Sequence, residues 1–76
     1  MRERGDYDVL SAREREVMDL RVDGVTLKEA GALLHISLFT VASHQRRALF
    51  KLGVSSRAEA RRVRARYLSR TIEQLA

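Results

Sequence analysis

Residues 26–52 read TLKEAGALLHISLFTVASHQRRALFKL, and this stretch decides the fold. Thr26, followed three residues later by a glutamate, has the spacing of a capping box, which marks the start of a helix. We therefore expect a short helix over residues 27–34. Ser37 is a further N-cap residue, and the apolar residues after it recur at helical spacing. This pattern predicts a longer helix over residues 38–52.

His35 and Ile36 lie between these two helices, and histidine tolerates the left-handed backbone of a tight turn. Two helices joined by so short a turn form a helix-turn-helix unit, although an ordinary helical hairpin has the same periodicity. The charge on the helix expected over residues 38–52 favours the helix-turn-helix, because no acidic residue lies between Ala30 and Ala58. A helix face that meets only water normally mixes both signs of charge.

Two further helices flank this unit. The same capping pattern, a serine followed three residues later by a glutamate, occurs at Ser11 and Ser56. A glycine-valine pair, which is typical of a helix C-terminus, ends the first and third expected helices. We therefore expect an all-α domain over residues 10–76 with helices at about 12–23, 27–34, 38–52 and 57–74, the last one extended, after an N-terminal arm over residues 1–9.

The basic residues are concentrated in the second part of the chain. Residues 1–29 carry six basic and eight acidic side chains, whereas residues 30–76 carry nine basic and two acidic ones. The net charge is +5 and the isoelectric point is near 10.7. This asymmetry is typical of a protein that binds a polyanion, and a solvated basic face is the alternative interpretation.

The composition excludes several classes of protein. The chain has no cysteine and two histidines, so we expect neither a disulfide nor a structural zinc site. It has no nucleophile–base–carboxylate set and no glycine-rich phosphate loop, so we expect no enzyme and no cofactor. No apolar run approaches the roughly 20 residues of a membrane span, and the start lacks the apolar stretch of a signal peptide. We therefore expect a cytoplasmic protein.

The sequence resembles the LuxR/GerE family of helix-turn-helix transcription regulators over residues 10–68. The longest matching segments are LSAREREV at residues 10–17, GVTLKE at 24–29 and KLGVSSRAEA at 51–60. Shorter matches at Ile36-Ser37, Thr40-Val41 and His44 lie between them in the family's order. From the length of the chain we expect a stand-alone, GerE-like regulator of bacterial transcription.

The resemblance implies that the helix over residues 38–52 enters the major groove of double-stranded DNA in a sequence-specific manner. A homodimer would bind a pseudo-palindromic site at the bacterial nucleoid. The implied base-reading residues are Ala42, Ser43 and Arg46, with Arg46 paired to guanine, although the family usually has lysine or arginine where this chain has Ala42. The implied phosphate contacts are Thr26, Lys28, Thr40, His44, Arg47 and Lys51.

Three apolar residues depart from the family pattern on this helix. Leu38 and Phe39 stand where polar residues are usual, and Phe50 stands where arginine or lysine is frequent. For Phe39 we consider apolar contact with thymine methyl groups, contact with a protein partner, and packing beside the first or second helix. The alternative function is therefore a protein-interaction module that binds RNA polymerase, a sigma factor or another regulator through these three residues.

The last expected helix has two apolar stripes at helical spacing. The first comprises Ala58, Ala65, Leu68, Ile72 and Leu75, and the second comprises Ala60, Val63 and Tyr67. One stripe packs on the core, and the other is a candidate for a two-fold dimer interface. We assign Ala60, Val63 and Tyr67 to the dimer interface, although the periodicity leaves open which stripe faces the core. Val63 and Tyr67 as scattered surface residues are a further interpretation.

Overall fold

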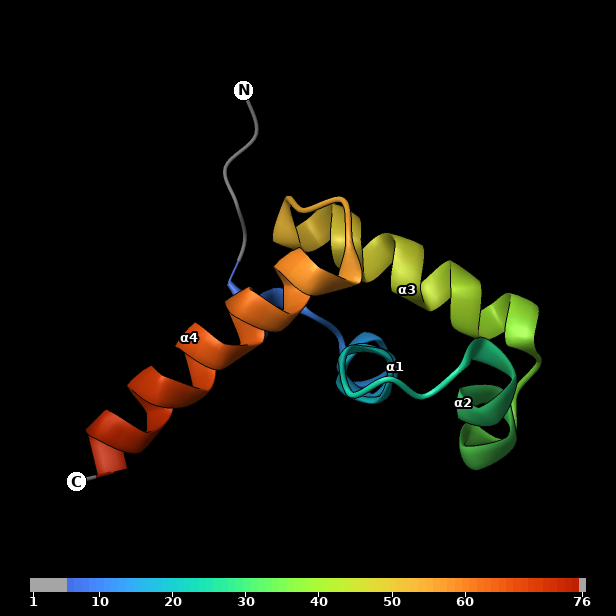
Figure 1. Ribbon diagram of the computed structural model, residues 1–76, viewed down its shortest axis with the longest axis horizontal. Coiled ribbons are helices and arrows are strands. Elements are labelled where there is room, and N and C mark those ends of the chain that lie inside the picture. The colour runs from blue at the N-terminus through green and yellow to red at the C-terminus, as the bar shows by residue number, and fades with distance from the viewer. Residues whose placement is uncertain (1–5, 76) are drawn as a thin grey trace.

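The computed structural model describes residues 6–75, and all the regular structure in this range is helical (Figure 1). The elements are the 3₁₀ turn η1 (Tyr7–Val9), α1 (Ala12–Val22), α2 (Leu27–Leu34), α3 (Leu38–Leu52) and α4 (Arg57–Leu75). This architecture confirms the expected all-α fold with four α-helices and a long C-terminal one. The bounds of each α-helix lie within one residue of the expected range.

The capping residues form the local hydrogen bonds expected at the N-termini of α1 and α2. Ser11 Oγ accepts from the Glu14 amide at 3.2 Å, and Glu14 Oε1 accepts from the Ser11 amide at 2.9 Å. Thr26 and Glu29 form the same reciprocal box at the start of α2. Because each box satisfies amides that the helix itself leaves unpaired, it sets the first residue of the helix.

Three residues with positive φ end the first three α-helices. Gly24 and Gly53 have φ of +92° and +70°, and the valine after each donates its amide back to the preceding helix. His35 has φ of +59° and forms the turn between α2 and α3. Gly31 allows that turn to fold back on α2, since a Cβ at this position would lie 2.7 Å from the Ile36 carbonyl oxygen.

Helix α1 occupies the centre of the fold, and Figure 1 shows it end-on with α3, α4 and α2 around it. Its side chains enter two apolar clusters. Val17 packs with Ala30 of α2 and Val41 of α3. The larger cluster joins η1, α1, α3 and α4 and comprises Tyr7, Leu10, Met18, Val22, Ala48, Leu52, Ala60 and Val63. The helix-turn-helix is therefore held against α1 on one side, and α4 against the other.

The assignment of Ala60, Val63 and Tyr67 to a dimer interface is wrong. Ala60 and Val63 are 0% and 2% exposed within the single protomer, and Tyr67 packs against the same core cluster. Its ring lies 5.8 Å from the ring of Tyr7, centroid to centroid. This stripe faces inward because Tyr7 and Met18 supply the apolar surface that covers it. The exposed stripe of α4 is the other one.

Residues 6–9 of the expected N-terminal arm belong to the folded domain, while residues 1–5 lie outside the described range. Tyr7 is only 2% exposed, and its hydroxyl donates to Asp19 Oδ1 at 2.6 Å. The guanidinium of Arg15 stacks near the rings of both Tyr7 and Tyr67. The arm prediction is thus wrong for these residues, since a large aromatic side chain before the first N-cap completes the core.

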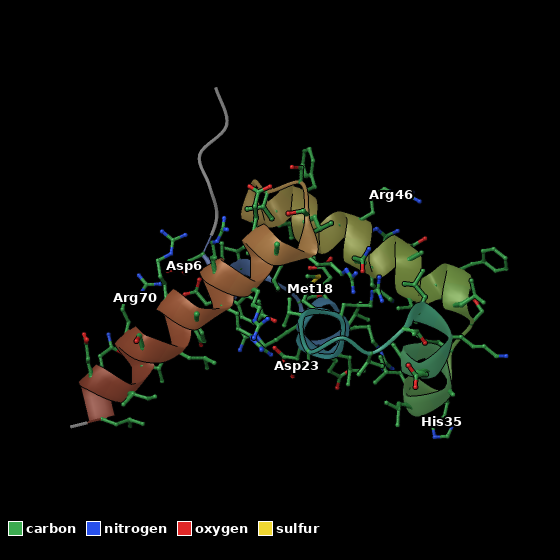
Figure 2. The ribbon with its side chains drawn as sticks, in the orientation of Figure 1. Asp6, Met18, Asp23, His35, Arg46 and Arg70 are labelled. Atoms are coloured by element: carbon green, nitrogen blue, oxygen red, sulfur yellow. The ribbon has the colours of Figure 1, made fainter. Side chains whose placement is uncertain are left out.

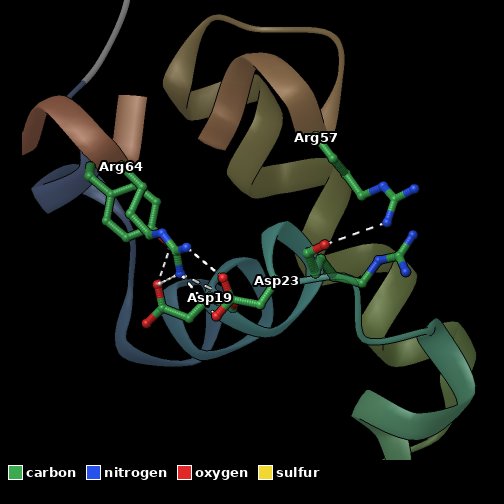
Figure 3. Close-up of polar contacts among 6 residues, drawn as sticks. Asp19, Asp23, Arg57 and Arg64 are labelled. Atoms are coloured by element: carbon green, nitrogen blue, oxygen red, sulfur yellow. Dashed lines mark hydrogen bonds and ion pairs between the residues drawn. The ribbon is translucent and has the colours of Figure 1, made fainter. Parts of the chain in front are cut away.

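Ion pairs join α4 to the acidic first part of the chain. In Figure 3, Arg64 projects from α4 toward Asp19 of α1 and toward Asp23, the C-cap residue of that helix. Its Nη2 lies 2.6 Å from Asp23 Oδ1, and its Nη1 lies 3.6 Å from Asp19 Oδ1. Further along α4, Arg70 pairs with Asp6. These contacts neutralise cations on the inward side of α4.

Candidate nucleic-acid interface

The outward face of α3 carries the residues expected to read bases. Arg46 is exposed, and in Figure 2 it projects from the side of α3 that faces away from Met18 and the core. Ala42 and Ser43 are half-buried and lie one turn earlier. At about 100° per residue, the three side chains fall within an arc of roughly 100°. The structure therefore places these three expected positions on one outward surface.

Neither Arg46 nor Arg47 is sequestered by packing inside the protomer. Both are exposed, and within residues 6–75 neither guanidinium forms an ion pair or a hydrogen bond. Arg64 differs, because its guanidinium is held by two aspartates. An exposed guanidinium presents a planar set of N–H donors that suits bidentate contact with phosphate or guanine.

The inward face of α3 holds this surface in position. Val41, Ala48 and Leu52 are fully buried in the two core clusters. Gln45 lies at the edge of this stripe, where its Oε1 accepts a hydrogen bond of 2.6 Å from Arg21 Nε. The rotation of α3 about its own axis is therefore fixed by buried contacts, and the outward face keeps its direction.

The start of α2 is less open to anions than a bare helix N-terminus. Thr26 Oγ1 already accepts from the Glu29 amide, and the Thr26 amide already donates to Glu29 Oε1. The backbone amide of Thr26 is the main cause that lowers the pKa of Glu29, so this carboxylate stays ionised at the helix start. Thr26 and Lys28 are both exposed, and the Lys28 ammonium remains the cation at this site.

Two expected phosphate ligands on α3, Thr40 and His44, are less available to a phosphate than a fully exposed side chain with no partner. Thr40 is exposed, but its amide donates to Ser37 Oγ at 3.1 Å and its hydroxyl lies 3.0 Å from the same atom. His44 is half-buried, and its Nδ1 is enclosed with no hydrogen-bond partner among the described residues. The Nδ1 side of the His44 ring is therefore buried in the protein.

Lys51 differs from the other expected phosphate ligands because it binds a carboxylate of the core. Its Nζ lies 2.8 Å from Glu14 Oε1, and the Glu14 side chain is only 6% exposed. Burial raises the pKa of Glu14, but the hydrogen bonds from Lys51 and from the Ser11 amide outweigh it and hold the pKa below its ordinary value. The pair joins the end of α3 to the start of α1.

The three apolar residues that depart from the family pattern are exposed. Phe39 is 77% exposed, Phe50 is 68% exposed and Leu38 is 39% exposed. The interpretation that Phe39 packs beside α1 or α2 is therefore wrong. The first turn of α3 is short of apolar neighbours on this side, because the core stripe of the helix begins at Val41 on the inward face.

Sequence reasoning did not single out a cluster of arginines between α1 and α4. Arg21, Arg57 and Arg61 line a surface hollow of about 430 Å³ together with Ser56 at the start of α4. Arg57 Nη1 donates to the Arg21 carbonyl at 3.4 Å, as Figure 3 shows. Burial, and then the charge of Arg57, lower the pKa of Arg21. The contact between the Arg57 guanidinium and the Arg21 backbone carbonyl, 36 residues apart, has no local signal in the sequence, so only the fold reveals it.

Two further properties of the described residues bear on the class of protein. Across residues 6–75, no three potential ligands among histidine, cysteine, aspartate and glutamate are grouped so as to hold a metal ion. Within the same range, every helix is too short or too polar to cross a membrane.

Residues 8–64 match the family model described as bacterial regulatory proteins, luxR family. The chain is 46% identical over 52 residues to spore germination protein GerE of Bacillus subtilis, which covers 68% of this chain and 70% of that protein. It is equally identical over 52 residues to a probable transcriptional regulatory protein, NarL, of Mycobacterium tuberculosis, of which it covers 24%. Transcriptional regulatory protein TdiR of Thauera aromatica is 47% identical over 47 residues, 21% of its length.

The family match spans α1, the helix-turn-helix and the first part of α4, up to residue 64. The chain thus covers most of one short relative and less than a quarter of the two longer regulators. No solved structure shows a significant match.

Proposed function

We propose that this chain, which belongs to the luxR family of bacterial regulatory proteins, binds double-stranded DNA sequence-specifically with α3 in the major groove. It is a DNA-binding transcriptional regulator rather than an enzyme, as its family is. The observation that carries the proposed geometry is the outward face of α3, where Arg46 and Arg47 are exposed and unpaired. The expected site of action is the chromosome in the bacterial cytoplasm.

The charge around α3 supports this orientation. No acidic residue lies between Ala30 and Ala58, so a phosphate backbone approaching α3 meets no carboxylate from α3 itself. An unpaired cationic face also releases counterions when it neutralises phosphates, which favours binding at low salt. By contrast, α4 presents Arg64 and Arg70 to aspartates of its own chain.

The proposed roles follow the exposure of each side chain. Arg46 donates to guanine, and Ala42 and Ser43 contact the neighbouring bases. Arg47 and Lys28 contact phosphates as exposed cations. Lys51 keeps Glu14 and uses its remaining N–H donors for a phosphate, since an ammonium has three. Thr26, Thr40 and His44 complete the proposed phosphate contacts.

Loss of the α3 cations tests this proposal. We expect Arg46→Ala/Arg47→Ala to weaken binding to a selected duplex by about 10- to 100-fold in fluorescence anisotropy, since one guanine-reading arginine is worth roughly 1–3 kcal/mol. The matched control is Arg61→Ala/Arg62→Ala, which removes the same charge from exposed positions on α4. Equal losses in the two variants, with circular dichroism showing intact folds, would contradict a role for α3 in the groove.

A homodimer through the exposed stripe of α4 completes the proposal. Leu68, Ile72 and Leu75 are 47%, 66% and 83% exposed and share one side of the helix at three- and four-residue spacing. Helix-turn-helix dimers bind half-sites about one turn of DNA apart, and we expect the same spacing here, roughly 10 bp between half-site centres. Such a site is pseudo-palindromic.

The oligomeric state of two charge variants tests the dimer. Ile72→Asp introduces a carboxylate into the exposed stripe, and Gln74→Asp introduces the same group at an exposed position on another side of α4. Light scattering after gel filtration should give a monomer for the first and a dimer for the second. A parent protein that is monomeric both alone and on a two-half-site duplex would refute the dimer.

A further inference from the structure

Phe39 is the most exposed aromatic side chain among the described residues and stands on the same side of α3 as Arg46. It is the second residue of α3 and is 77% exposed. Its backbone is held, because Ser37 Oγ accepts from the Thr40 amide and caps the same turn. The ring therefore projects from an ordered helix start and is not covered by any other element of the fold.

Helical geometry aligns Phe39 with the proposed guanine reader. Arg46 lies seven residues later, which places the two side chains about 20° apart around the axis and roughly 10 Å apart along it. Ala42 and Ser43 fall between them on the same face. The first turn of a recognition helix is the part that reaches base edges most directly. Phe39 thus occupies a base-reading place without any hydrogen-bonding group.

We infer that Phe39 is a specificity-determining residue that packs on the C5 methyl group of a thymine in the major groove. This inference rests on the proposed function. Thymine is the base that offers a methyl group there, and phenylalanine contacts it as an apolar surface. A protein partner would also cover an exposed ring, but the exposed cations Arg46 and Arg47 two turns further along α3 and the absence of acidic residues on α3 favour a polyanion as the occupant.

The geometry also sets the spacing within the half-site. The duplex rises 3.4 Å per base pair along its axis, so roughly 10 Å along α3 spans at most about three base pairs. We therefore place the thymine within about three base pairs of the guanine that Arg46 reads. The small side chain of Ala42, half-buried and one turn after Phe39, leaves room for the ring to lie against a base.

Replacement of single thymines by deoxyuridine tests the inference, because it removes the methyl group and keeps the hydrogen-bonding edges. The duplex is one selected for tight binding from a random pool. For the parent protein, one such replacement in a single half-site should weaken binding by about fourfold, the value of one buried methyl group. For Phe39→Ala, which removes an exposed side chain and leaves the core intact, the same replacement should have no effect.

Phe50→Ala is the matched control, since it removes a second exposed phenylalanine near the other end of α3. It should keep the fourfold penalty at the same thymine. Parent protein that binds DNA but is equally sensitive to deoxyuridine with and without Phe39 overturns the inference while the proposed function stands. Failure of the parent to select any duplex overturns the proposed function itself. Intact methyl sensitivity in Phe39→Ala, together with loss of binding to RNA polymerase, assigns the ring to a protein partner instead.

Discussion

The Nζ of Lys51 lies 2.8 Å from Oε1 of Glu14, so the last turn of α3 is tied to the first turn of α1. Glu14 is at the same time the N3 residue of a capping box, in which it accepts from the Ser11 amide. One carboxylate thus serves both the start of α1 and the position of α3. A side chain expected to bind phosphate has a structural role as well.

Lys51→Met should destabilise the fold, because it leaves the buried Glu14 carboxylate without its cationic partner. We expect a loss of about 1–3 kcal/mol in the free energy of unfolding, the cost of an unsatisfied buried group. Urea denaturation measures it. Lys28→Met makes the same substitution at an exposed lysine and should change stability by less than about 0.5 kcal/mol. Equal effects in the two variants would contradict the role of the ion pair.

Protonation of Glu14 should contribute to unfolding of the protein in acid. Burial tends to raise the pKa of Glu14, but the Lys51 and Ser11 hydrogen bonds lower it below the ordinary value of 4.5. The folded state therefore holds the ionised form more strongly than the unfolded chain does. This contribution is complete above the ordinary pKa and is lost as the pH falls through the lower, folded value. The free energy of unfolding should fall less steeply below pH 4.5 in Glu14→Gln than in the parent. Parallel profiles between about pH 5 and pH 2 would rule this out.

Tyr7→Phe should cost about 1–2 kcal/mol, since it removes the 2.6 Å hydrogen bond to Asp19 and keeps the buried ring. For a domain of this size, the thermal midpoint should fall by roughly 4–8 °C per kcal/mol. Tyr67→Phe is the control, because the Tyr67 hydroxyl donates no hydrogen bond within residues 6–75. A Tyr7→Phe midpoint equal to that of the parent would show that the hydroxyl contributes nothing.

Gly31→Ala should destabilise the turn between α2 and α3. Helix propensity alone favours alanine over glycine by about 1 kcal/mol in a helix interior. The new Cβ, however, would lie 2.7 Å from the Ile36 carbonyl oxygen, so the turn must move away from α2. We expect a net loss of about 1–3 kcal/mol, typical of an overpacked site. Chemical denaturation measures the change in the free energy of unfolding. A variant more stable than the parent would disprove the close approach of the Ile36 carbonyl oxygen to Gly31.

The helices could be predicted from sequence because their start and stop signals are local. The capping residues Ser11, Thr26 and Ser37 form bonds within three residues, and Gly53 ends α3 through its own backbone conformation. His35 takes the left-handed conformation expected of it for the same reason. Such signals do not depend on how the helices pack against one another.

The packing of α4 could not be predicted in this way. Its periodicity distinguishes two apolar stripes, but the inward one is chosen by Tyr7, a residue more than fifty positions earlier. The outward face of α3 was easier to predict, because Arg46 and Arg47 lie opposite a well-marked apolar stripe that includes Val41 and Ala48. The pairing of Lys51 with Glu14, 37 residues apart, again required the fold.

The end of α4 has a consequence for how this protein assembles. Residues 72–75 are all exposed, so the last turn of the helix gains nothing from the protomer core. A helical turn without tertiary contacts frays, and ordering it has an entropic cost of about 1–2 kcal/mol per residue. Self-association through Ile72 and Leu75 would therefore be coupled to winding of this turn. The helical signal at 222 nm would then rise with protein concentration, and mass action would govern how much of α4 is formed.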